Sequence, residues 1–283
     1  MKRTAMVIAV LGMCSLSFAQ DKPAAQNPPA GQATGPAAAP QGKRPPAAKT
    51  QPEYDAFNAA KQLPDAAAVE KAADDFATKF PESELRVELY KLAMQKYQQA
   101  NNADKMLEMA QKALTYDADE PLALLGVAQV MAERTRDTDL DKDQRLAEAK
   151  KDAERALGTI DTDLPTTGYA PEQLTAYKGF LKSDAYAILG TLAFNAKNWP
   201  EAETDLRKSI DAFPQQLDAI AVFRLAVALD MQNKIPDAMK YADQAVDLTK
   251  DRPDSPAGKA ARAEKDRLTK LSSGTAPGQN PPK

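Results

Sequence analysis

The chain of 283 residues carries 37 lysines and arginines, 40 aspartates and glutamates, no histidine and one cysteine, for a formal net charge of −3. Without histidine, the chain has no imidazole base and cannot build the common His/Cys zinc sites. A pI near 5.3 also means that there is no overall basic field to attract nucleic acid. The composition therefore excludes several catalytic and nucleic-acid-binding classes, and we expect no cofactor.

The first 19 residues predict a secretory signal peptide. A basic pair precedes a short apolar run from Ala5 to Leu16, and small residues occupy positions −3 and −1 of a cleavage site after Ala19. The run is too short to span a membrane. We therefore expect a periplasmic or secreted mature chain. A lipoprotein acceptor at Cys14 is the alternative, which the bulky Met13 before it disfavours.

Two segments are rich in Pro, Ala, Gln and Gly and contain few large apolar side chains: residues 20–52 and residues 272–283. Such segments cannot bury enough surface to offset the entropy of ordering. We predict that the first is a disordered linker and the second a disordered tail. The folded part is then residues 53–271.

Within residues 53–271, alanine-rich segments with a period of 3.6 follow one another, and no convincing strand pattern occurs. The predicted helices, in chain order, are 53–62, 66–79, 84–100, 103–116, 120–133, 144–157, 171–197, 199–212, 216–232, 235–249 and 255–271. Pro200 and Pro236 stand in first turns, which tolerate a missing N–H. Pro81 and Pro214 follow helices and end them.

The sequence pattern of one helical hairpin occurs twice, with an offset of 36 residues. The matching pairs are Leu189 and Leu225, Gly190 and Ala226, Ala202 and Ala238, Ser209 and Ala245, and Ile210 and Val246. Large residues recur where a helix fills the core, and small ones recur where two helices cross closely. Because one hairpin cannot bury its own apolar face, the copies are expected to stack.

This pattern resembles the tetratricopeptide repeat (TPR). The residues at the signature offsets of a 34-residue unit starting at Ser183 are Leu189, Gly190, Ala202, Leu206, Ser209 and Pro214, with Trp199 at the turn. The clearest repeats are 87–120, 183–216 and 219–252. The resemblance implies an all-α, right-handed solenoid of about five TPR-like hairpins with a C-terminal capping helix. An irregular alanine-rich helical bundle is the alternative.

A possible calcium loop lies between two predicted helices. Asp137, Asp139, Asp141 and Glu148 occupy positions 1, 3, 5 and 12 of a twelve-residue stretch, the spacing of ligands in an EF-hand. Lys142, however, stands at position 6, where that loop requires glycine for a sharp turn. We interpret the stretch as a solvated insertion and keep calcium binding as the weaker alternative. No other metal site is indicated.

The resemblance implies a binding protein. TPR domains mostly bind other proteins, so we expect an exported, non-catalytic scaffold for a protein or peptide partner in the bacterial envelope. The alternatives are an envelope enzyme or polysaccharide-processing accessory on a helical solenoid, and a purely structural spacer. Carboxylates with raised pKa values in a deep cleft would favour the enzyme. The expected partners do not include nucleic acid, no direct membrane span is expected, and the oligomeric state is open.

The family also implies where a partner would bind. Positions 2, 5, 9, 12 and 13 of the first helix of each TPR hairpin line the concave face. Carried onto this chain, they indicate Lys91, Gln95, Gln98, Gln99, Val127, Val130, Met131, Asp184, Thr191, Phe194, Asn195, Phe223, Val227, Asp230 and Met231. The family's carboxylate clamp is not reproduced at these offsets. Phe194 and Phe223 have an alternative role as core residues, because aromatic side chains at helical spacing usually fill the core.

Overall fold

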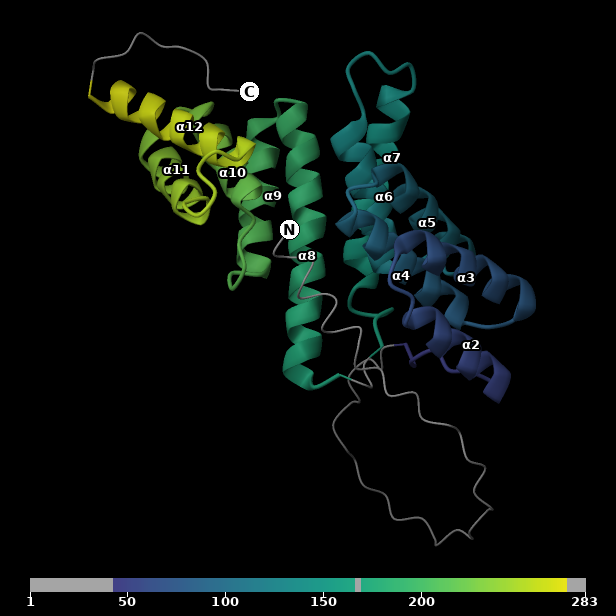
Figure 1. The fold of residues 1–283 in the computed structure, drawn as a ribbon. Helices are drawn as coiled ribbons and strands as arrows, with labels where there is room; N and C mark the ends of the chain where they lie inside the picture. The colour runs from purple at the N-terminus through teal and green to yellow at the C-terminus, as the bar shows by residue number, and fades with distance from the viewer. Residues whose placement is uncertain (1–42, 166–168, 274–283) are drawn as a thin grey trace, which may run out of the picture. The chain divides into compact units, whose positions relative to one another are not determined.

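The computed structural model describes residues 43–165 and 169–273, and α-helix is the only regular secondary structure in these residues (Figure 1). The predicted signal peptide, the linker up to residue 42 and the tail beyond residue 273 lie outside the described residues. None of the described helices is both long and apolar enough to cross a membrane.

The described helices follow the predicted order. They are α2 (Gln51–Lys61), α3 (Ala66–Lys79), α4 (Leu85–Gln99), α5 (Ala103–Tyr116), α6 (Pro121–Arg134), α7 (Lys142–Thr159), α8 (Pro171–Asn195), α9 (Trp199–Ala212), α10 (Ala219–Asp230), α11 (Ile235–Leu248) and α12 (Pro256–Ser272). Each predicted helix is present, and the ends agree to within three residues. The all-α prediction is therefore confirmed for the described part of the chain.

The described residues form two compact units, and each is considered by itself. Of the described residues, unit 1 contains those up to Ala123 and those within Gly158–Leu174. Unit 2 contains Leu124–Leu157 and the described residues from Thr175 onward. In unit 1, α4 packs against α3 and α5, while α2 packs against α3 and α4. In unit 2, α10 packs against α9, α11 and α12. Helices that are neighbours in sequence are thus neighbours in space, as stacking of hairpins requires.

The core of unit 1 is built from aromatic and long aliphatic side chains. Phe57 of α2 packs against Phe76 of α3 with ring centroids 6.4 Å apart. Leu89 of α4 and Met109 of α5 are completely buried. Burial of such side chains contributes about 1.5–3 kcal/mol each relative to exposure, so this core holds the α2–α5 hairpins together.

The core of unit 2 contains large residues together with the small residues predicted at helix crossings. Leu206, Leu225, Leu229 and Leu268 are fully buried and share one cluster with the alanines of α9, α10 and α11. Gly190 lies at a close crossing of α8 and α9: a Cβ added there would lie 2.7 Å from Leu206 Cγ. A larger residue at this position would force the two helices apart.

Three hairpins share one turn. Asn101, Lys197 and Asn233 are the described non-glycine residues with positive φ, at 54°, 58° and 60°. In each hairpin, the N–H of the next residue donates to the carbonyl five residues before it, with N···O distances of 2.9 Å in all three cases. This closes the first helix with a Schellman-type cap. The shared turn repeats the same hairpin geometry in both units.

Ordered structure begins earlier than the predicted boundary at residue 53. Thr50 accepts a hydrogen bond from the Glu53 N–H and caps α2, which starts at Gln51. The preceding residues also contact unit 1, since the Lys43 N–H donates to the Thr162 carbonyl at 3.0 Å. The disordered-linker prediction is therefore wrong for residues 43–52, because composition does not reveal charged contacts to distant parts of the chain.

Candidate peptide-binding surfaces

The first-helix face of unit 1 is largely closed. Lys91 and Gln95 of α4, both predicted to contact a partner, are buried. Gln98 is half-buried, and only Gln99 of these predicted residues is exposed. The amide nitrogen of Gln95 is buried and has no hydrogen-bond acceptor among the described residues.

Lys91 is the centre of a buried ion cluster. Its Nζ lies 2.9 Å from Glu120 Oε1 and 3.0 Å from Glu88 Oε1. Glu120 also accepts a hydrogen bond from the Ala123 N–H at 2.6 Å and so caps the start of α6. Burial raises the pKa of Glu120, as does the nearby Glu88 carboxylate, while Lys91 opposes the shift. Lys91 therefore stabilises the fold and is not free to hold a partner.

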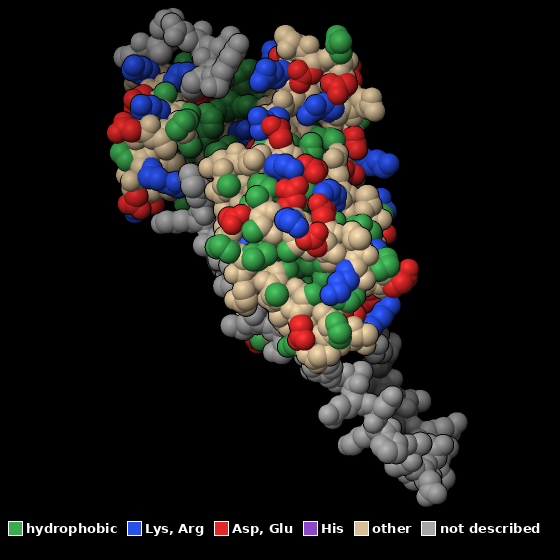
Figure 2. Space-filling view, turned by 45° about the vertical axis from the view of Figure 1, so that its right-hand side comes forward, with side chains coloured by type: hydrophobic (Ala, Val, Ile, Leu, Met, Phe, Trp, Pro, Cys, Tyr) green, Lys and Arg blue, Asp and Glu red, His purple; other side chains and the backbone are tan. Residues whose placement is uncertain are grey.

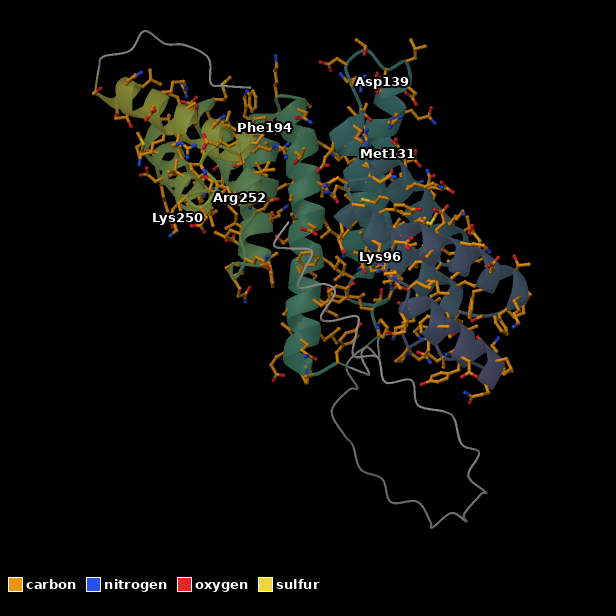
Figure 3. All side chains as sticks on the ribbon, in the orientation of Figure 1. Lys96, Met131, Asp139, Phe194, Lys250 and Arg252 are labelled. Atoms are coloured by element: carbon orange, nitrogen blue, oxygen red, sulfur yellow. The ribbon has the colours of Figure 1, made fainter. Side chains whose placement is uncertain are left out.

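On α6 in unit 2, the three residues predicted to contact a partner belong to the core. Val127, Val130 and Met131 are all buried, and Figure 3 shows Met131 on this helix. Their apolar character is thus explained by packing.

On α8, the predicted residues have mixed roles. Asp184 is half-buried and Asn195 is exposed. The buried Thr191 hydroxyl donates to the Ala187 carbonyl at 2.7 Å. Phe194, labelled at the end of α8 in Figure 3, packs edge-on against Trp199 with ring centroids 5.4 Å apart. Phe194 is therefore a half-buried residue at the margin of the core.

On α10, an apolar stripe follows one face of the helix. Phe223 is half-buried against the cluster of Val222, Ala245 and Ala261, and Val227 is buried. The two ends of the stripe are open, because Ile220 is 45% exposed and Met231 is 38% exposed. Ile220 was missing from the predicted set, although it stands one helical turn before Phe223 and its periodicity would have indicated it.

Asp230 and Arg224 complete the α10 surface. The Asp230 carboxylate forms an ion pair with Arg267 of α12, which also pairs with the buried Glu264. The Arg224 guanidinium, which sequence reasoning missed, donates from Nη1 to Thr191 Oγ1 at 2.7 Å. Burial lowers the pKa of Arg224, while Asp218 and Glu133 oppose the shift. Arg224 thus adds a cation beside the apolar stripe.

The calcium hypothesis gains no support from the acids between α6 and α7. Helix α7 already begins at Lys142, so the second half of the supposed loop is helical. The Lys142 ammonium lies 2.8 Å from Asp137 Oδ1, and Asp139, labelled in Figure 3, accepts a hydrogen bond from the Arg136 N–H. Within the described residues, no three acidic, histidine or cysteine side chains converge on a point that could hold a metal ion.

Two described carboxylates have raised pKa values, the feature that would favour an enzyme. One is Glu120, whose oxygens are engaged by Lys91 and a helix N-terminus. The other is Asp152 of α7, whose pKa is raised by burial and by the Glu148 carboxylate. The two carboxylates belong to different units. Elsewhere, Figure 2 shows Lys/Arg and Asp/Glu side chains interleaved over the visible surface.

The shared turn, the packing of consecutive helices and the small residues at the helix crossing together decide the fold. The fold is TPR-like. No family model matches the chain, and no curated protein matches it. Among solved structures, it is similar to the crystal structure of YrrB, described as a TPR protein with an unusual peptide-binding site. The TM-score is 0.45 at 17% sequence identity, over 72% of this chain and 86% of that chain.

Proposed function

We propose that this TPR-like chain is an exported, non-catalytic scaffold that binds a protein or peptide partner in the bacterial envelope. The observation that carries the proposal is the apolar stripe of α10, from Ile220 to Met231, whose two ends remain exposed on the first helix of a hairpin. Exposed apolar anchors beside half-buried aromatic side chains are typical of grooves that accept extended or helical segments. Arg224 can add a contact to a carbonyl or carboxylate of the partner.

The second helix of the same hairpin provides a matched control. Leu248 of α11 is 40% exposed, almost the same as Met231, the residue that follows α10. A photo-reactive amino acid placed at either position therefore samples an equally open apolar site on a different helix. We expect crosslinking to a discrete envelope protein from position 231 and none from position 248. Equal labelling from both positions would contradict the proposal.

The contribution of the stripe can then be measured with the partner so identified. Ile220→Glu and Met231→Glu should abolish its capture, because each places a charge on the apolar surface. Both side chains are exposed, so melting should hardly change. Leu248→Glu is the control and should retain full capture.

Export is a separate part of the proposal. The signal-like residues 1–19 predict that the envelope form begins at Gln20. N-terminal sequencing of the protein from the envelope fraction tests this. An unprocessed N-terminus in the cytoplasm, or a lipid-modified Cys14, would contradict it.

A further inference from the structure

Residues 43–50 lie against unit 1 and form a strap, the name used below for this segment. The Lys43 ammonium pairs with Asp117, and the Arg44 guanidinium pairs with Glu84. The Lys49 ammonium donates to the Glu82 carbonyl at 2.9 Å. The strap therefore binds this surface through its cations, at points 33 to 74 residues away along the chain.

The strap forms one wall of a pocket of about 290 Å³ in unit 1. The other walls come from the start of α4, the end of α5 and the segment that contains Asp163 and Pro165. Tyr116, which is 42% exposed, lies in the lining together with Pro46 of the strap. Its ring stacks on Tyr90 with centroids 5.8 Å apart. An exposed aromatic ring beside proline is the arrangement by which grooves recognise extended proline-rich segments.

Without the strap's own cations, the pocket is acidic. Its lining then holds the carboxylates Glu84, Glu88, Asp117, Glu120 and Asp163 against the cations Arg86 and Lys91. Lys91 is engaged by Glu88 and Glu120, and the Arg86 guanidinium lies 4.2 Å from the Tyr116 ring centroid. The carboxylates Glu84, Asp117 and Asp163, which we call the acidic recess, are those that receive the strap.

We propose that the acidic recess binds an extended Lys-Arg-Pro-Pro-like segment of a partner protein, and that Lys43–Pro46 of this chain occupies it in cis. The proposal rests on the scaffold function and names a partner class for unit 1. The strap's ion pairs are partly exposed to water, and exposed pairs are individually weak and screened by salt. The tethered segment nevertheless competes at a high local concentration. A partner segment must therefore displace the strap, so occupation in cis weakens the apparent affinity of the recess for the partner.

The test uses the labelled peptide KRPPAAK, which is the sequence of residues 43–49, and fluorescence anisotropy with the full chain. Lys43→Ala combined with Arg44→Ala removes the two strap cations that pair with the acidic recess and leaves Lys49 in place. We expect this double variant to bind the peptide about tenfold more tightly than the wild type, because the competing tethered segment is weakened. Adding Asp117→Asn should reverse the gain, and 0.5 M salt should reduce binding. Asp211→Asn, at an exposed carboxylate of unit 2, is the control.

The possible outcomes separate the two proposals. Equal peptide affinity of the wild type and the double variant would overturn occupation in cis. No binding to either protein would overturn the acidic recess as a site, while crosslinking from position 231 would still support the scaffold function. A wild-type dimer that becomes monomeric in the double variant would show that the occupant is a second copy of this chain, which also contradicts the proposal. Circular dichroism and melting must match among the variants.

Discussion

The two units use the same hairpin turn, but the first-helix faces of the two units differ in chemical character. In unit 1, Lys91 and Gln95 are buried and the nearby surface is charged and covered by the strap. In unit 2, α10 leaves Ile220 and Met231 exposed. Turn residues and small residues at helix crossings determine the repeat, whereas the inward positions are free to vary. A repeat architecture can thus hold two chemically different surfaces on one chain.

The second helices of the two units are more alike. In unit 1, Lys105 of α5 lies 2.7 Å from Glu70 of α3. In unit 2, Lys234 lies 2.6 Å from Glu203 of α9. Burial tends to raise the pKa of each glutamate, but hydrogen bonds from the partner lysine and neighbouring donors lower it overall. Adjacent hairpins are therefore joined by the same type of ionic link.

The largest expected effect comes from the buried ion cluster of unit 1. Lys91→Met leaves Glu88 and Glu120 without their cation, and loss of one partner of a buried pair costs about 3–5 kcal/mol. Chemical denaturation at pH 7 measures the loss. Lys96→Met, at a half-buried lysine of the same helix that donates to the Pro64 carbonyl, is the control and should cost under about 1 kcal/mol.

The destabilisation caused by Lys91→Met should depend on pH, in a direction set by the pKa of Glu120. The pKa of Glu120 is raised in the folded state, so its contribution to stability is present below the unfolded pKa and is lost as pH rises through the folded pKa. In Lys91→Met, protonation of Glu120 relieves the uncompensated charge. The destabilisation should therefore be greatest at neutral pH and shrink as pH falls toward 4.5. A pH-independent loss would show that Lys91 acts through packing alone.

The next effect tests the close helix crossing of unit 2. Gly190→Ala places a Cβ 2.7 Å from Leu206 Cγ and 3.1 Å from the Leu206 backbone nitrogen. Overpacking of this kind typically costs about 1–3 kcal/mol, even though alanine favours a helix. Gly158→Ala is the control, because nothing lies within 4 Å of its added Cβ. That change should stabilise α7 by up to about 1 kcal/mol. Thermal melting compares the two, and equal shifts would contradict the crossing argument.

A smaller effect tests the turn that both units share. Lys197 has a φ of 58°, which costs a side-chain-bearing residue about 1 kcal/mol relative to glycine. Lys197→Gly should therefore raise the free energy of unfolding by about 0.5–1 kcal/mol. Asn101→Gly should give less, because asparagine tolerates this conformation better. If Lys197→Gly is destabilising, the left-handed turn is wrong.

The smallest effect concerns the strap. The coupling energy between Lys43 and Asp117, from a double-mutant cycle, should be roughly 0.2–1 kcal/mol and should vanish in high salt, as for other exposed pairs. A larger, salt-resistant coupling for Lys43 would make the strap part of the core.

The predicted binding residues differ in their exposure. The family offsets indicated Phe223, which is half-buried, and Met231, which is exposed. The same offsets indicated Val127 and Val130, which are buried. An apolar side chain at an inward position looks the same in the sequence whether a neighbouring helix covers it or leaves it open. Binding by any of these residues stays a prediction.

The sequence by itself determined the helices and their order. Periodicity, prolines in first turns and small residues at crossings act within a hairpin or between adjacent copies, so a short window of residues encodes them. Tertiary structure decided which polar groups pair and which apolar side chains remain exposed to solvent. Lys43 and Asp117 are separated by 74 residues, and neither the helical period nor the repeat offset relates them. Such contacts arise only when the folded hairpins bring distant charges together, because electrostatic attraction depends on distance in space and not along the chain.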